Sequence, residues 1–212
     1  MKKFELSKIT KLEVVELLAL ISSAAAARNE KILQLLLKLY IDKEFNKTWL
    51  YESLLQLYLF AGFPIALSSL KILSELIRVT KKYSDKRTPK QIQQEGIISC
   101  KKIYGDSFHK LVSNVKIYSP ELSDWLILEG YGKVLSRKAL SLKKRELLII
   151  SILSSLKFSD QLYSHIRGGF RLGNNLQSIN SVIKNLKLID QIDSSNFGLL
   201  VFHKVISANK TV

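Results

Sequence analysis

The sequence predicts an all-α fold, and three observations lead to that prediction. Apolar residues run in stretches too long for β-strands, and these stretches end at helix stop signals. The period-two alternation of Val, Ile and Thr that is typical of half-buried strands is almost absent. The composition, 47% hydrophobic and 24% charged, is that of a globular chain that folds along its whole length.

Helix boundaries follow from local signals. Ser119 followed by Pro120 offers an N-cap and a proline at the first helical position, where its missing N–H costs no hydrogen bond. Ser141 is a second candidate cap, a short break falls at 157–158, and the Gly173-Asn-Asn sequence is a natural helix stop. The expected helices span residues 10–26, 29–41, 47–60, 64–82, 89–104, 106–116, 120–135, 141–156, 159–172, 175–187 and 194–206.

The length of 212 residues favours one domain, 1–212, built from two tandem helical repeats. A shift of 130 residues lays apolar helix on apolar helix and places Glu16 on Glu146 and Leu35 on His165. We therefore expect a first repeat at about 10–80, a polar and basic linker at about 81–90, and a second repeat at about 91–206. Only the second repeat carries a histidine at this position.

The formal net charge of +15 raises the question of a nucleic-acid or membrane-surface partner. The densest basic segment runs from Arg78 to Lys90, whereas the other lysines are scattered and have no interleaved aromatic residues to stack on bases. This distribution favours a solvated surface over a nucleic-acid site. The most apolar window, 54–73, contains one Gln and one Lys and is broken by Gly62 and Pro64, so we expect no membrane span.

Cys100 is the single cysteine of the chain, so no intramolecular disulfide and no cysteine metal cluster can form. The basic N-terminus is interrupted by charges where a signal peptide needs an apolar run, and we expect a cytoplasmic protein. No histidine has a metal-ligand spacing such as HExxH, and no glycine-rich phosphate loop occurs. The sequence predicts no metal and no cofactor.

Glu146 and His165 lie on consecutive predicted helices whose short link makes them antiparallel. Histidine titrates near neutral pH, and a neighbouring carboxylate orients its ring, so this pair could perform acid-base catalysis. Arg167 could bind a substrate carboxylate through two hydrogen bonds, and Gln161 lies nearby. The alternative is that His165 is a hydrogen-bonded core residue without chemistry.

The stretch from Asp124 to Gly173 resembles the carboxymuconolactone decarboxylase family, which has the alkylhydroperoxidase D-like fold. The window 54–73 is similar to the same family's Tyr-x-Gly-x-Pro-x-Ala-rich helix, and Ile103–Leu111 resembles a longer, two-repeat subgroup. The residues that carry the resemblance are Trp125, Tyr131, Gly132, Arg137, Leu140, Arg145, Glu146, Leu147, Gln161, Leu162, His165, Arg167, Gly168 and Gly173, together with Tyr58, Gly62, Pro64 and Ala66.

The resemblance implies one of two chemistries. In the peroxidase branch, two cysteines stand 12 and 15 residues after the glutamate; here these positions hold Phe158 and Gln161, and neither can form a sulfenic acid or a disulfide. The decarboxylase branch lacks those cysteines and acts without a cofactor on a carboxylated muconolactone. The expectation is a lyase in which Glu146 and His165 are catalytic and Arg167, Gln161 and Tyr131 bind a small carboxylate substrate.

Three further expectations accompany this one. The domain could instead be a catalytically degenerate scaffold or binding module. The alkylhydroperoxidase or peroxiredoxin-type antioxidant activity that family labels imply is disfavoured by the missing dithiol. The family commonly forms trimers or hexamers, so we expect self-association.

Overall fold

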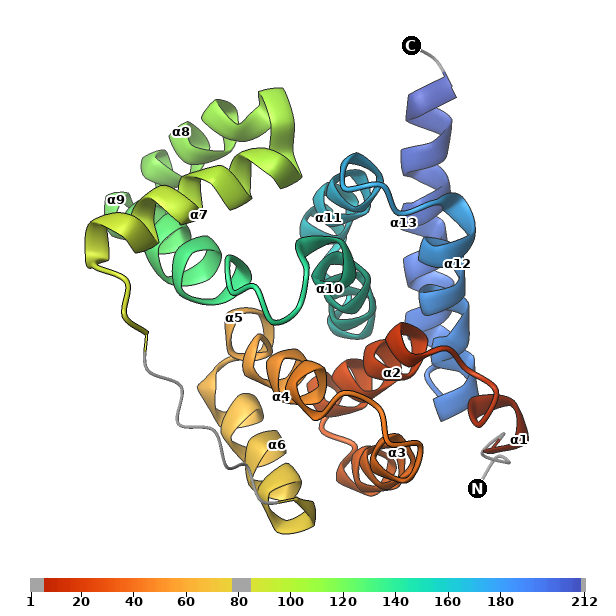
Figure 1. The fold of residues 1–212 in the computed structure, drawn as a ribbon. Coiled ribbons are helices and arrows are strands. Elements are labelled where there is room, and N and C mark those ends of the chain that lie inside the picture. Colours follow the sequence, from red (N-terminus) through yellow and green to blue (C-terminus); the bar gives the residue numbers. More distant parts are fainter. Residues whose placement is uncertain (1–5, 78–84, 211–212) are drawn as a thin grey trace.

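The computed structural model describes residues 6–77 and 85–210, and every regular element in these ranges is a helix (Figure 1). The all-α prediction is confirmed. The elements are α1 (Leu6–Ile9), α2 (Val14–Ala26), α3 (Glu30–Asp42), α4 (Lys47–Leu55), α5 (Tyr58–Ala61), α6 (Phe63–Leu76), α7 (Pro89–Tyr104), η1 (Gly105–Ser107), α8 (Phe108–Tyr118), α9 (Pro120–Trp125), η2 (Leu126–Leu135), α10 (Leu142–Leu156), α11 (Ser159–Arg171), α12 (Leu176–Lys184), η3 (Asn185–Ile189) and α13 (Ile192–Lys210).

Several expected helices differ from the observed ones. The expected helix 47–60 is divided into α4 and α5, because the chain tightens into i→i+3 hydrogen bonds around Leu57. The expected helix 120–135 continues past α9 as the π-helix η2, whose wider turns end with the hydrogen bond from Ser136 N to Tyr131 O. Residues 78–84 lie outside the described residues. They include the expected end of helix 64–82, the first part of the expected linker and the first part of the basic segment.

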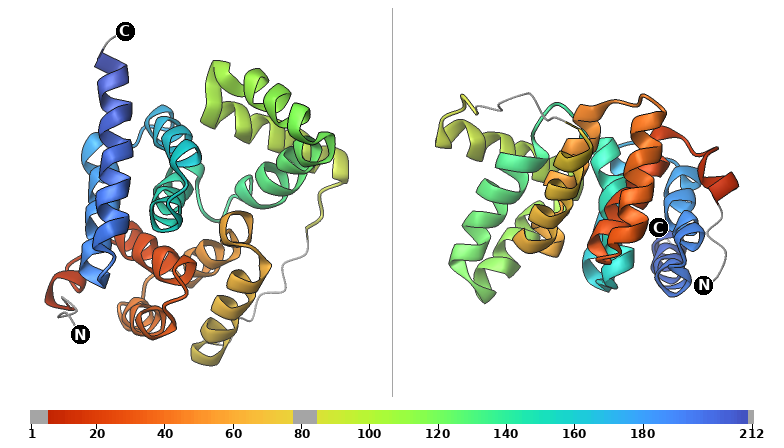
Figure 2. Two further views of the ribbon diagram at one scale, coloured as in Figure 1. Left: turned by 180° about the vertical axis from the view of Figure 1, so that it is seen from behind. Right: turned by 90° about the horizontal axis from the view of Figure 1, so that it is seen from below.

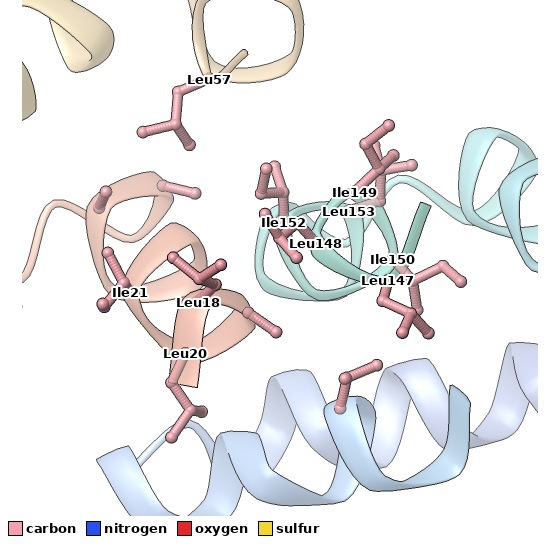
Figure 3. Packing of buried hydrophobic residues seen from close by; sticks show 14 of the residues in the cluster. Leu18, Leu20, Ile21, Leu57, Leu147, Leu148, Ile149, Ile150, Ile152 and Leu153 are labelled. Carbon is pink, nitrogen blue, oxygen red and sulfur yellow. The ribbon is translucent and has the colours of Figure 1, made fainter. Parts of the chain in front are cut away.

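Helices α2 and α10 form the centre of the molecule. Residues 17–26 of α2 and 145–154 of α10 are all buried, as expected of helices that are covered on every side. Leu18 of α2 faces Leu148 and Ile152 of α10 across this contact (Figure 3). A hydrogen bond of 2.8 Å from Ser151 Oγ to the carbonyl oxygen of Ala19 joins the two helices directly.

The segment α7–η2 lies to one side of the α10–α11 hairpin, as the green ribbons of Figures 1 and 2 show. Helices α7 and η2 approach closely because both have a glycine at the crossing. A Cβ at Gly132 would stand 2.5 Å from the carbonyl oxygen of Ile92, and a side chain at Gly96 would collide with the carbonyl oxygen of Ile127. This packing holds Tyr131 of η2 against α7.

The apolar window 54–73 becomes the end of α4, all of α5 and most of α6. Gly62 has φ of +84°, a conformation that favours glycine, and it separates α5 from α6 with Pro64 in the first turn of α6. Among the described helices, none has the length and apolar character needed to cross a membrane.

Candidate acid-base site

Glu146 and His165 meet inside the α10–α11 hairpin. Ser141 caps α10, Lys157 ends it in the left-handed conformation with φ of 59°, and α11 runs back beside it from Ser159. The distance from His165 Nδ1 to Glu146 Oε2 is 2.9 Å. Glu146 is 0% exposed and His165 is 4% exposed, so the hydrogen bond is formed away from bulk water.

The second atom of each side chain is left for other partners. Glu146 Oε1 is buried and has no hydrogen-bond partner among the described residues. His165 donates from Nδ1 to the carboxylate, which leaves Nε2 to act as a base when the ring is neutral and as an acid when it is protonated. The pair therefore has the parts of an acid-base couple.

Two aromatic rings cover His165. The Phe60 ring of α5 stands edge-to-face with it at 5.7 Å between centroids, and the Tyr104 ring of α7 does so at 6.2 Å. Phe60 and Tyr104 are themselves half-buried. The two rings thus come from α5 and α7, two elements that are far from the hairpin in sequence.

Tyr131 lies behind Tyr104, with 6.2 Å between the two ring centroids. Burial raises the pKa of Tyr131 well above its usual value, and the neighbouring Tyr104, Cys100 and Glu146 raise it further. Tyr131 is only 3% exposed, whereas Tyr104 is half-buried. Its predicted role in substrate binding stays a prediction.

Cys100 is part of the same buried cluster, although the sequence offered it no partner. Burial raises the pKa of its thiol to about 12, Tyr131 lowers that pKa by a hydrogen bond, and Glu146 raises it. The thiol is 0% exposed and remains protonated near neutral pH. Because Cys100 and Glu146 are 46 residues apart in the sequence, their proximity could not be predicted from it. The sequence did indicate that Gly96, Cys100 and Tyr104 share one face of a helix, because they are spaced at i, i+4 and i+8.

Gly168 allows α7 to approach the pair. A Cβ at this position would stand 2.5 Å from Ile103 Cγ2 and 3.1 Å from Glu146 Oε2. Any larger residue would therefore push on α7 and on the carboxylate that holds His165. The absence of a side chain at Gly168 therefore allows α7, which carries Cys100 and Tyr104, to lie next to the Glu146–His165 pair.

Gln161 and Arg167 are placed differently from the pair. Gln161 is exposed, one turn before His165 on the same face of α11. Arg167 is half-buried and two residues after His165, so it leaves the helix about 200° around the axis. Neither forms a hydrogen bond with Glu146 or His165 in the described part of the chain. Substrate binding by these two residues stays a prediction.

A buried ionic cluster, which the sequence did not reveal, fixes the start of α10. Arg145 is 0% exposed; its Nη2 lies 2.7 Å from Glu52 Oε2, and its Nη1 lies 3.1 Å from Gln56 Oε1. Arg137 donates from Nε to Glu52 at 2.9 Å. Burial opposes the charge of Glu52, but the hydrogen bonds and charges of the two arginines outweigh it and lower its pKa. The cluster ties α4 to α10 one residue before Glu146.

No family model matches this chain, and no curated protein matches its sequence. The acid-base site therefore rests on the geometry just described.

Proposed function

We propose that this protein is a cofactor-free carboxy-lyase that acts on a small carboxylated lactone or a related acid, in the manner of the carboxymuconolactone decarboxylases. The observation that carries the proposal is the buried contact of 2.9 Å between Glu146 Oε2 and His165 Nδ1. A histidine that is held by a carboxylate in a nearly dry site is suited to protonate the carbon of a dienolate.

The proposed reaction has two steps. The bond between the substrate and its carboxylate breaks, carbon dioxide leaves, and the electron pair moves into the unsaturated lactone as a dienolate. Protonated His165 then gives the Nε2 proton to the carbon, and water later restores it. Glu146 keeps the ring oriented and stabilises its protonated form throughout. Arg167, Gln161 and Tyr131 belong to the proposal as substrate contacts.

The helix bounds support the proposed two-repeat, alkylhydroperoxidase D-like domain. A shift of 130 residues brings α2 near α10 and α3 near α11, and the next two helices of the first half, α4 and α6, near α12 and α13. The residues from α7 to η2, which belong to the expected second repeat at about 91–206, lie between these two matched sets, so the shift of 130 residues matches only the later part of that repeat. The second set then begins with α10, which carries Glu146, and continues with α11, which carries His165.

Peroxide reduction is a weaker candidate for this site. Phe158 and Gln161 stand where a dithiol would be, and the raised pKa of Cys100 keeps its thiol protonated. A catalytically degenerate scaffold is the second candidate, and the 4% exposure of His165 favours it because a core histidine would be equally enclosed. We further propose that the protein is cytoplasmic. We also propose that it self-associates, and light scattering tests this self-association.

The proposal is tested by incubating the purified protein with a panel of carboxylated lactones, carboxymuconolactone included, and following carbon dioxide release. His165→Ala should lower kcat by about 100-fold or more, as expected when a general acid is removed. His109→Ala is the matched control because His109 is exposed on α8 and away from Glu146. Turnover that survives His165→Ala would remove His165 from the mechanism, and the absence of turnover for the whole panel would favour the scaffold.

A further inference from the structure

We propose that Tyr104 is a third catalytic residue of this site and that its hydroxyl donates a hydrogen bond to the oxyanion of the bound substrate. The inference rests on the proposed function, because the oxyanion is the lactone oxygen of the dienolate. It goes beyond that function by naming the group that stabilises the developing charge and the class of ligand that this group recognises.

Position is the first argument. Tyr104 ends α7, and its ring contacts the rings of both His165 and Tyr131, each at 6.2 Å. Of the three side chains that α7 and η2 bring to the cluster, Cys100 and Tyr131 are enclosed, whereas Tyr104 is half-buried. Tyr104 is therefore the one of these three side chains that is partly exposed, and its ring lies against that of His165.

Charge is the second argument. The carboxyl group of Glu146 is buried beside His165, and its Oε1 has no hydrogen-bond partner among the described residues, so a carboxylate here would oppose the binding of a second anion. An oxyanion beside it needs a donor that carries no negative charge itself. Burial raises the pKa of Tyr104 to about 12; a hydrogen bond with Tyr131 lowers that pKa, and Glu146 and Cys100 raise it, so the hydroxyl stays protonated at neutral pH.

The other neighbours of His165 leave this role to Tyr104. Phe60 has no hydrogen-bond donor, and Arg167 leaves α11 about 200° around the axis from His165, so neither contacts the His165 ring as a donor in the way that Tyr104 can. In the reaction, the electron pair from the broken carbon–carbon bond is delocalised onto the carbonyl oxygen of the lactone. The Tyr104 hydroxyl donates a hydrogen bond to this oxygen. The Tyr104 proton is not transferred, and the proton that reaches carbon comes from His165 Nε2.

The test compares Tyr104→Phe, which retains the ring, with the wild type. 4-Nitrophenolate is the probe because it is a planar oxyanion, and 4-nitroanisole is the matched ligand without the charge. Tyr104→Phe should weaken 4-nitrophenolate binding by about tenfold or more, the loss expected for one hydrogen bond to a charged group. It should leave binding of 4-nitroanisole within about twofold. Tyr163→Phe is the control, since Tyr163 is a half-buried tyrosine of α11 two residues from His165.

The outcomes separate this inference from the proposed function. Equal binding of 4-nitrophenolate by the wild type and Tyr104→Phe, or no binding by either, overturns the role of Tyr104. With an active lactone, Tyr104→Phe should lower kcat by about 100-fold while KM changes less, as for the loss of one oxyanion donor. No turnover of any lactone by the wild type, together with weaker phenolate binding by Tyr104→Phe, would refute the lyase chemistry and leave the oxyanion site standing.

Discussion

Replacing Glu52 with Ala would leave Arg145 without its carboxylate in the core. Arg145 is 0% exposed and Glu52 is 1% exposed, and the ion pair between them spans 2.7 Å. Removing one partner of a buried pair costs about 3–5 kcal/mol, because the remaining charge cannot reach water. The folding equilibrium constant should therefore fall by about a hundredfold or more.

Urea denaturation followed by circular dichroism measures this loss. The midpoint should fall while the slope of the free energy of unfolding against urea changes little, because the buried surface is nearly unchanged. Glu75→Ala is the control, because Glu75 is an exposed glutamate on α6. A double replacement, Glu52→Leu with Arg145→Met, should recover much of the lost stability, since apolar side chains need no charged partner. A loss below about 1 kcal/mol for Glu52→Ala would show that Arg145 reaches another anion or water.

Two further predictions concern the surroundings of Glu146. Gly168→Ala should destabilise the protein by about 1–3 kcal/mol, because its Cβ would stand 2.5 Å from Ile103 Cγ2. Gly130→Ala is the control and should be tolerated, because a Cβ at Gly130 would have nothing within 4 Å. Equal urea midpoints for the two variants would contradict the close packing of α7. Cys100 should resist iodoacetamide at pH 8 in the native protein, because a buried thiol with a pKa of about 12 forms little thiolate at that pH, and it should react fully in urea. Mass spectrometry measures the alkylation. Rapid alkylation of the native protein would place the thiol at the surface.

The helices were largely predictable because their signals are local. Caps such as Ser119 and Ser141 satisfy backbone groups within three residues of themselves, and Gly173 ends α11 through its own backbone conformation. Where the prediction differed, the cause was also local. The tight turn at Leu57 and the π-helix around Tyr131 depend on hydrogen-bond spacings that no residue type specifies.

The candidate site was only half visible in the sequence. Glu146 and His165 are 19 residues apart on a helical hairpin, so helix geometry is enough to predict that they can meet. Cys100 and Tyr104, and Glu52, which pairs with Arg145, come from elements separated from them by dozens of residues. Their proximity is set by how α4 and α7 pack on α10 and α11, and a single sequence does not record that packing.

The sequence by itself thus determined the all-α class and the α10–α11 hairpin, in which Glu146 and His165 could meet, because each follows from periodicity, capping and helix length. The tertiary structure decided which other groups share the site. Gly168 lets α7 come close enough to place Tyr104 against His165, and burial then keeps the tyrosine and Cys100 neutral. The chemistry open to the pair therefore depends on long-range packing, which sets both the neighbours and the dielectric around them.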